Sequence, residues 1–162
     1  LFAIFEKEAD KILKEEVYKS NEFAITFLGR LEKFPTHLRE KMDLIQERSQ
    51  DYAKRMINVA IGYNGRTEIV DAAKKLAQDV AEKKIDVNTI NENTFKNYLY
   101  ANFSDPDMIV RTGYTQRLSG FLTYQSTYSE LYFMNKFWPE FSREDLGTVV
   151  SEFDSRVRRF GK

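Results

Sequence analysis

Short apolar segments alternate with longer amphipathic segments along most of the chain. The strand-like segments are 21–29, 56–65 and 107–110, and the helix-like segments are 1–20, 34–55, 65–84 and 142–160. The helix-like segments repeat apolar residues at intervals of three and four, whereas the strand-like segments are nearly continuous apolar runs. Such alternation is typical of βαβ units. Because strands buried on both faces lack an alternating polar pattern, we predict an α/β fold with a parallel sheet flanked by helices.

The length and composition exclude several classes of protein. The 162 residues contain no repeat, low-complexity segment or linker, so we predict one domain over 1–162. Lysine plus arginine and aspartate plus glutamate both total 25, which argues against a dedicated nucleic-acid-binding protein. The absence of cysteine excludes disulfides, thiolate metal sites and cysteine nucleophiles. No apolar run approaches the roughly 20 residues of a membrane span, and we expect a cytoplasmic protein.

Two arginines and a serine follow the third apolar strand. Arg111 comes directly after segment 107–110, and Arg117 and Ser119 lie in the loop beyond it. Ligands of open parallel sheets bind beyond the carboxyl ends of the strands, and guanidinium groups match phosphate oxygens. The pattern indicates a diphosphate site. The alternative is a surface loop whose arginines pair with acidic side chains, and the spacing alone leaves both interpretations open.

These residues are part of a longer pattern. Segment 107–133 reads DMIVRTGYTQRLSGFLTYQSTYSELYF, and WPEF follows at 138–141. It resembles the signature of the cis-prenyltransferases, the undecaprenyl diphosphate synthase family: R-T-S/G-G-E-x-R-L/I-S, F-L-L-W-Q, Y-x-E-L-Y-F and W-P. The segments FLGRLEKFPTHLREKM (27–42), NVAIGYNGRTEIVDAA (58–73) and RRFG (158–161) resemble further motifs in the family's order. The resemblance therefore covers nearly the whole chain.

The resemblance implies an enzyme that condenses isopentenyl diphosphate with an allylic diphosphate into a cis-polyprenyl diphosphate. In the family, the residues matching Arg111, Arg117 and Ser119 hold isopentenyl diphosphate, and the residue matching Glu130 helps to hold Mg²⁺. One carboxylate with phosphate oxygens and water suits Mg²⁺; outside the family context, Glu130 reads as a carboxylate in a salt bridge. We expect Arg66 near the same crevice, although an arginine at a helix start is often structural.

The resemblance also implies roles for the two ends of the chain. Arg159 and Gly161 match the family's R-x-G, which crosses the interface of a homodimer and completes the neighbouring diphosphate site; the alternative is a frayed basic terminus. The family's first helix lines a tunnel for the isoprenoid, which Phe2 and Phe5 fit, yet aromatic residues at helical spacing fit a plain core equally well. Contact with a membrane is expected only through the product.

The chain departs from the family pattern at several points, and two of them bear on the site. Thr115 stands where the family has glutamate in R-T-x-G-E, and bulky Tyr114 stands where it has glycine. The family's H-x-M-D-G-N-G-R-W segment, whose aspartate binds Mg²⁺ and the allylic diphosphate, has no match. Because the sequence opens at Leu1 within a helical pattern, we expect the catalytic aspartate upstream of Leu1 and no activity from this chain alone.

Two rival functions remain beside the homodimeric enzyme. A non-catalytic subunit of a heteromeric cis-prenyltransferase is favoured by Thr115, whereas Arg117, Ser119 and Glu130 favour an enzyme. A nucleotide sensor or other phospholigand-binding domain lacks support, because neither G-x-x-x-x-G-K-[ST] nor G-x-G-x-x-G is present. We favour the enzyme, with two diphosphate substrates, Mg²⁺ and no nucleic-acid partner.

Overall fold

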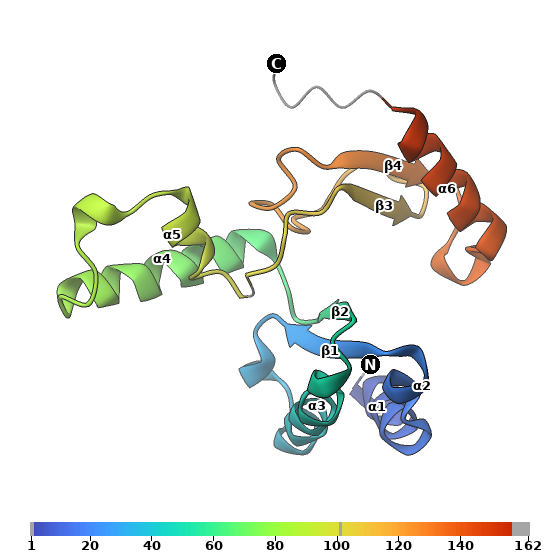
Figure 1. Cartoon of the computed structure of the whole chain (residues 1–162), viewed down its shortest axis with the longest axis horizontal. Helices are drawn as coiled ribbons and strands as arrows, with labels where there is room; N and C mark the ends of the chain where they lie inside the picture. Colours follow the sequence, from blue (N-terminus) through green and yellow to red (C-terminus); the bar gives the residue numbers. More distant parts are fainter. Residues whose placement is uncertain (1, 101, 157–162) are drawn as a thin grey trace.

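The computed structural model describes residues 2–100 and 102–156 (Figure 1). β1 (Phe23–Leu28) pairs in parallel with β2 (Arg55–Ala60), and β3 (Met108–Thr112) pairs in parallel with β4 (Glu130–Met134). The α-helices of these residues are α1 (Phe2–Glu15), α2 (Val17–Asn21), α3 (Thr36–Ser49), α4 (Gly65–Ala81), α5 (Glu92–Lys96) and α6 (Arg143–Ser155). Short 3₁₀ turns cover Leu31–Lys33, Gln50–Tyr52, Val87–Thr89 and Trp138–Glu140. The predicted α/β fold, with parallel strands flanked by helices, is confirmed.

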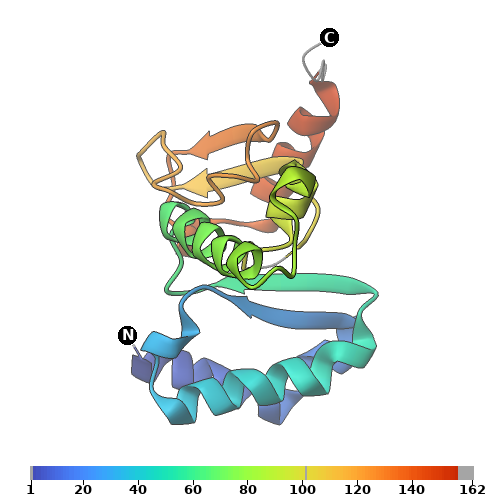
Figure 2. The ribbon, with the colours of Figure 1, turned by 90° about the vertical axis from the view of Figure 1, so that its left-hand side faces the viewer.

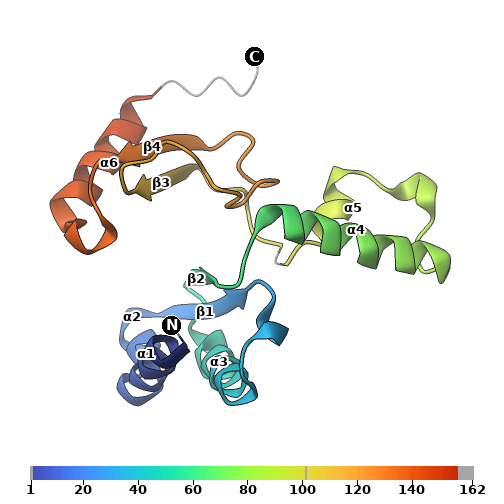
Figure 3. The same cartoon turned by 180° about the vertical axis from the view of Figure 1, so that it is seen from behind.

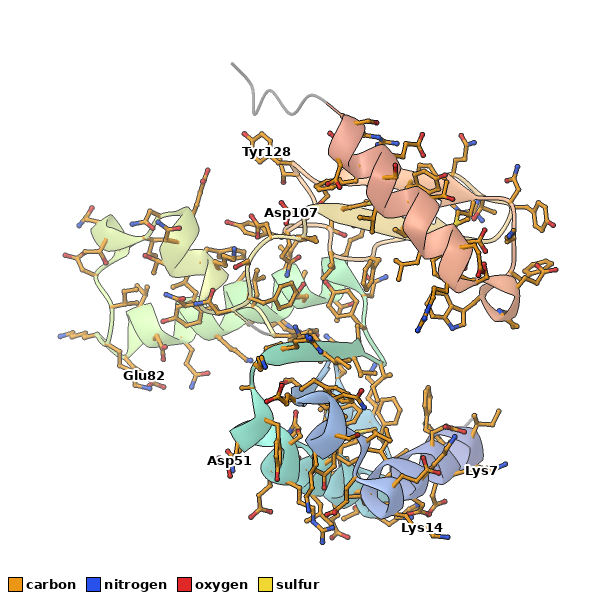
Figure 4. The ribbon with its side chains drawn as sticks, turned by 45° about the vertical axis from the view of Figure 1, so that its right-hand side comes forward. Lys7, Lys14, Asp51, Glu82, Asp107 and Tyr128 are labelled. Atoms are coloured by element: carbon orange, nitrogen blue, oxygen red, sulfur yellow. The ribbon has the colours of Figure 1, made fainter. Side chains whose placement is uncertain are left out.

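The first strand pair packs against two helices. α1 and α3 lie side by side next to β1 (Figures 1 and 3). Leu38, Met42 and Ile45, on one face of α3, are at most 2 % exposed and form the centre of this core. Lys7 and Lys14 of α1 point away from it to solvent (Figure 4). The amphipathic pattern thus locates the apolar faces of both helices.

The helix boundaries differ in detail from the prediction. The segment 1–20 is interrupted at Glu16, whose φ of 46° lies in the left-handed region and separates α1 from α2. The segment 34–55 leaves the α-helical form after Ser49, and Arg55 already begins β2. The helices of residues 2–100 and 102–156 are all too short or too polar to cross a membrane.

β4 is the element that the sequence pattern did not identify. Its residues ELYFM lie inside the aromatic run 121–138, which contains neither glycine nor proline to mark a strand end. The strand pairs with β3 from Met108 opposite Glu130 to Thr112 opposite Met134. The carboxyl ends of β3 and β4 therefore lie together, and the loop after β3 folds over this edge.

Candidate functional site

Arg111 lies at the carboxyl end of β3, and residues 113–120, which we call the arginine loop, fold back over it. Nη1 of Arg111 donates one hydrogen bond to Oγ of Ser119 at 2.9 Å and another to the carbonyl oxygen of Arg117. The structure thus brings together Arg111, Ser119 and the backbone of Arg117, whose side chain is exposed. Two of the three side chains selected from the sequence are in direct contact.

The charge of Arg111 is not neutralised within the described part of the chain. Both of its hydrogen-bond partners are neutral oxygen atoms, and no carboxylate of residues 2–100 and 102–156 forms an ion pair with it. Its side chain is only partly exposed. A guanidinium group without a counter-charge favours an anionic ligand, and its planar geometry suits phosphate.

A small cavity of about 240 Å³ adjoins Arg111. Its apolar wall consists of Ile109, Val110, Leu118 and Phe121. The cavity therefore combines one cationic side chain with a short hydrocarbon surface. This combination suits a small ligand that carries a phosphate group and a short apolar chain.

The backbone of the arginine loop adopts unusual conformations. Gly113 and Gly120 have φ angles of 97° and 79°, which glycine adopts without strain. Ser119 has a φ of 51°, a left-handed conformation that is uncommon for a residue with a side chain. Such conformations persist only where surrounding contacts impose them. At Ser119 this conformation accompanies the hydrogen bond to Arg111.

The arginine loop packs directly on the start of α4. The N–H of Gly65 donates to the carbonyl of Gly120 at 2.7 Å, and a Cβ at Gly65 would lie only 2.4 Å from Oγ1 of Thr123. Oδ1 of Asn64 caps the helix by accepting from the N–H of Arg66 at 3.1 Å. Arg66 therefore lies in the first turn of α4, and its side chain is exposed.

A buried carboxylate ties α4 to the segment that follows the arginine loop. Glu68 is 1 % exposed and accepts hydrogen bonds from the Tyr63 hydroxyl at 2.5 Å, the Gln125 amide at 3.2 Å and the Tyr100 N–H at 3.1 Å. Burial, followed by the Glu68 carboxylate, raises the pKa of Tyr63. Sequence reasoning missed this cluster, because a carboxylate on an amphipathic helix reads as solvent-exposed; the only signal was Gln125 inside the FLTYQ motif.

A second arginine, Arg30, follows β1 and is fully paired. Its guanidinium group donates to both carboxylate oxygens of Asp71, at 2.9 and 2.8 Å, and the Tyr100 hydroxyl donates to the same carboxylate at 2.6 Å. Arg30 first, and then Tyr100, hold the pKa of Asp71 well below its usual range. Burial and Asp71 raise the pKa of Tyr100 to about 12. This cluster also escaped the sequence analysis.

An apolar cavity of about 260 Å³ lies between α1, α3 and the first strand pair. Phe5, Ala9 and Ile12 of α1 line it, together with Ile57 and Val59 of β2. Its lining is almost entirely hydrocarbon, so it suits an apolar chain. Phe5 thus faces a cavity, whereas Phe2 is 46 % exposed and packs edge-on against Phe34.

Glu130 is not brought together with Arg111. It is the first residue of β4 and pairs with Met108, whereas Arg111 pairs with Phe133. Three strand positions correspond to about 10 Å, and an odd offset places the two side chains on opposite faces. Oε2 of Glu130 instead accepts a hydrogen bond from Nη1 of Arg156 at 2.9 Å, which matches the salt-bridge interpretation.

The structure says less about the other residues selected from the sequence. Thr115 lies in the arginine loop and places no carboxylate there, and Tyr114 is 63 % exposed with its ring against Phe137. Arg159 and Gly161 lie outside the described residues. Residues 2–100 and 102–156 contain no group of three or more histidine, cysteine, aspartate or glutamate side chains that could hold a metal ion.

Comparison with known protein families identifies close relatives. A profile of the prenyltransferase family of undecaprenyl diphosphate synthases matches residues 1–161. The tritrans,polycis-undecaprenyl-diphosphate synthase (geranylgeranyl-diphosphate specific) of Thermoplasma volcanium is 40% identical over 163 residues, covering 100% of this chain and 63% of that protein. The protein of the same name from Methanopyrus kandleri is 39% identical, covering 100% of this chain and 60% of that protein. The chain thus spans less than two thirds of the length of these relatives.

Solved structures of prenyl diphosphate synthases also resemble this chain. Lavandulyl diphosphate synthase from Lavandula x intermedia, in complex with dimethylallyl diphosphate, matches with a TM-score of 0.93 at 29% identity, over 99% of this chain and 70% of that chain. A probable undecaprenyl diphosphate synthase from Campylobacter jejuni matches with a TM-score of 0.85 at 32% identity, over 99% of this chain and 73% of that chain.

Proposed function

Because the chain belongs to the undecaprenyl diphosphate synthase family of prenyltransferases, we propose that it forms the isopentenyl diphosphate-binding part of a cis-prenyltransferase. Such an enzyme condenses isopentenyl diphosphate with an allylic diphosphate into a cis-polyprenyl diphosphate. The observation that supports this most directly is the surroundings of Arg111, which forms no ion pair within residues 2–100 and 102–156, contacts Ser119 and borders a small apolar cavity. The complete reaction is proposed for the whole protein, and we expect residues 1–162 alone to lack turnover.

The proposed roles follow from the geometry of the strand end. Arg111 and Arg117 bind the diphosphate oxygens, and the Ser119 hydroxyl donates a further hydrogen bond. Arg66 approaches the same ligand from the first turn of α4, where the positive end of the helix dipole favours an anion. The five-carbon group lies in the cavity beside Leu118. Holding the isopentenyl unit in reacting geometry removes much of the entropic cost of bringing two substrates together.

The alkylation requires no side-chain nucleophile. The allylic diphosphate ionises as its pyrophosphate departs, and the fixed isopentenyl double bond attacks the resulting carbon. The isopentenyl unit then loses a proton from the carbon next to the new cation, which the released pyrophosphate can accept, and this loss forms the new double bond. The task of the protein is therefore to position the substrates and to stabilise negative charge. The apolar cavity bordered by Phe5 is proposed to receive the growing isoprenoid.

Binding of isopentenyl diphosphate tests this proposal. By calorimetry, the purified protein should bind isopentenyl diphosphate and not ATP. The Arg117→Ala variant should bind isopentenyl diphosphate more weakly by about 1.5–3 kcal/mol, the contribution of a hydrogen bond to a charged group. Unchanged affinity in the variant would remove Arg117 from the site, and tight ATP binding would favour a nucleotide sensor.

Mg²⁺ remains part of the proposal, with Glu130 as one ligand. Glu130 is the one carboxylate that we propose as a ligand, so substrate phosphates, water and groups outside the described residues would complete the coordination. The metal would supply charge neutralisation at the diphosphate. Binding of Mn²⁺ followed by electron paramagnetic resonance should be weaker in Glu130→Gln than in the wild type; equal binding would exclude Glu130 as a ligand.

A homodimer is proposed because Glu130 and Arg111 do not meet within one chain. They lie at opposite ends and on opposite faces of the β3–β4 pair, so they reach one ligand only if a second copy contributes one of them. α6 also leaves Leu146 and Val150 each 50 % exposed, as a partner surface would require. We propose that Glu130 acts at the neighbouring site together with the Arg159–Gly161 tail.

Mixed dimers test this arrangement. Co-expressed Arg117→Ala and Glu130→Gln chains form heterodimers in which one site carries both changes and the other carries neither. Activity well above that of either variant alone would support a contribution across the interface. Activity no higher than that of the variants would show that both residues act within one chain.

The preferred allylic substrate and the location of the protein complete the proposal. The two archaeal relatives are named as geranylgeranyl-diphosphate specific, so geranylgeranyl diphosphate is the first primer to test. We propose a cytoplasmic enzyme that contacts membranes through its product. Vesicle sedimentation with and without polyprenyl diphosphate would measure that contact.

A non-catalytic subunit of a heteromeric enzyme is the alternative that Thr115 favours. The arginine loop, which accepts hydrogen bonds from Arg111, lacks the family's carboxylate at this position. Labelled isopentenyl diphosphate, an allylic primer and Mg²⁺ should yield polyprenyl product with the purified homomeric full-length protein. Absence of product with every primer, and its appearance only after a second family member is added, would establish the subunit role.

A further inference from the structure

The arginine loop ends in a tight turn over residues 118–121. The N–H of Phe121 donates to the carbonyl of Leu118 at 3.0 Å, and the two central residues, Ser119 and Gly120, both have positive φ angles, as in a type I′ turn. The first and last residues of a β-turn lie within about 7 Å of each other. The turn therefore places Leu118 and Phe121 next to each other.

This turn forms a wall of the cavity beside Arg111. Leu118 and Phe121 line the cavity together with Ile109, which is only 7 % exposed. Between them in the sequence, Ser119 accepts the hydrogen bond from Arg111. One turn thus carries both a contact at the cationic end of the cavity and part of its apolar wall.

Contacts with α4 and the residues before it hold this wall in place. The turn lies next to the start of α4 (Figures 1 and 2), where the N–H of Gly65 donates to the carbonyl of Gly120 at 2.7 Å. The ring of Phe121 packs edge-on against the ring of Tyr63, with 5.9 Å between the centroids, and the Tyr63 hydroxyl donates to buried Glu68. Aromatic pairs in this geometry attract each other, so Tyr63 fixes the position of the Phe121 ring.

The proposed reaction requires this site to distinguish between two diphosphates. Isopentenyl diphosphate and the allylic diphosphate carry the same head group, so the contacts of Arg111 and Ser119 cannot tell them apart. Only the surface that contacts the hydrocarbon tail can distinguish a short tail from a long one. At about 240 Å³, the cavity is smaller than the roughly 300–1,000 Å³ of sites for drug-sized ligands, so it suits a short tail.

We propose that Leu118 and Phe121 are specificity-determining residues that admit the five-carbon tail of isopentenyl diphosphate beside Arg111 and exclude the longer tails of allylic diphosphates. This selectivity rests on the proposed function. Tyr63 is a positioning residue that acts through Phe121. Hydrophobic pockets discriminate against one additional methylene group by roughly 10- to 200-fold, and a geranyl tail exceeds the isopentenyl group by a whole five-carbon unit.

Displacement of labelled isopentenyl diphosphate from the purified protein tests this selectivity, because a competitor bound at a separate site leaves the label in place. Unlabelled geranyl diphosphate should displace it at least ~10-fold less effectively than unlabelled isopentenyl diphosphate. In Leu118→Ala and Phe121→Ala this difference should decrease at least ~5-fold, because part of the wall is removed. Val70→Ala is the control and should keep the difference of the wild type, because Val70 is 49 % exposed, similar to Phe121 at 41 %, and does not line the cavity.

Further variants separate a lost wall from a damaged fold. Inorganic pyrophosphate, which has no tail, should bind to both alanine variants as tightly as to the wild type, because Arg111 and Ser119 are unchanged. Leu118→Phe should weaken binding of isopentenyl diphosphate at least ~10-fold and leave that of pyrophosphate unchanged, because a larger side chain fills the cavity. Tyr63→Leu should reduce the selectivity as Phe121→Ala does, whereas Tyr63→Phe, which keeps the ring contact, should preserve it.

The outcomes distinguish this selectivity from the proposed function itself. Equal displacement by geranyl and isopentenyl diphosphate in the wild type, or an unchanged difference in both alanine variants, would overturn the role of Leu118 and Phe121 and leave the proposed function standing. Unchanged affinity for isopentenyl diphosphate in Leu118→Phe would overturn it as well, and unchanged selectivity in Tyr63→Leu would refute the role of Tyr63. A wild type that binds neither isopentenyl diphosphate nor pyrophosphate would contradict the proposed function, and the selectivity with it.

Discussion

Two arginines lie at the carboxyl ends of strands in this chain, and their surroundings differ. Arg30, after β1, donates two hydrogen bonds to Asp71, which also accepts from Tyr100. Arg111, at the end of β3, donates hydrogen bonds to a hydroxyl and a carbonyl oxygen, and no described residue forms an ion pair with it. Position at a strand end is therefore not sufficient for an anion site. The decisive property is whether the protein supplies the counter-charge.

The two regions are physically connected. The Tyr100 hydroxyl bonds to Asp71 while its N–H bonds to Glu68. Glu68 in turn accepts from Gln125, which follows the arginine loop. The paired cluster around Arg30 thus supports the position of the loop beside Arg111. We infer that the first region contributes mainly to stability and the second mainly to binding.

The largest expected effect is the loss of stability when Glu68, which connects the two regions, is removed. Glu68→Ala leaves three donors without their acceptor, one of them on the buried Gln125, and should lower the free energy of unfolding by about 3 kcal/mol. Urea denaturation measures this loss. The exposed Glu47→Ala on α3 is the control and should stay within about 0.5 kcal/mol of the wild type. Similar values for both variants would show that Glu68 is not a structural link.

We expect that removing one arginine weakens ligand binding, whereas removing the other lowers stability. Arg111→Ala should weaken binding of isopentenyl diphosphate by about 2 kcal/mol, roughly 30-fold, because a charged donor is lost. Arg30→Ala should leave the dissociation constant nearly unchanged and lower the melting temperature instead. Calorimetry and thermal unfolding on both variants separate the effects. A binding loss in Arg30→Ala as large as in Arg111→Ala would break the distinction.

The Asp71–Arg30 pair should give stability a specific pH dependence. The pKa of Asp71 is lowered in the folded protein, so the ion pair stabilises the fold at neutral pH. This contribution decreases as the pH falls below about 4, the pKa of an unperturbed aspartate. Asp71→Asn should therefore melt at a lower temperature than the wild type at pH 7, with the difference shrinking below pH ~4. A difference that is constant with pH would contradict this account.

The smallest expected effect comes from adding a carboxylate near Arg111. Thr115→Glu restores the family residue and makes the surroundings of Arg111 more like those of Arg30. Without metal, its affinity for isopentenyl diphosphate should fall by about threefold, the size expected for an exposed ion pair. Thr115→Gln is the matched control. Equal affinities of the two variants would show that this position does not influence the anion site.

Much of the fold could be predicted because its elements have strong local patterns. The apolar spacing of Leu38, Met42 and Ile45 identifies α3, and the continuous apolar runs identify β1 and β2. β4 escaped prediction because no turn residue marks it within the aromatic run. The break at Glu16 escaped because nothing in the helical pattern signals a left-handed residue there.

The candidate site was only partly predictable for a different reason. The contact between Arg111 and Ser119 joins residues only eight positions apart in the sequence. The Glu68 cluster joins residues 57 positions apart in the sequence, and local spacing carries no information about such contacts. The separation of Glu130 from Arg111 depends on the register of β3 and β4, which required the tertiary structure.

The most direct test of the central claim is a crystal structure of the complete protein with isopentenyl diphosphate. The account predicts diphosphate oxygens within hydrogen-bonding distance of Arg111 and Ser119, with the five-carbon group against Leu118 and Phe121. A diphosphate bound elsewhere, with the Arg111–Ser119 pair left to solvent, would contradict it.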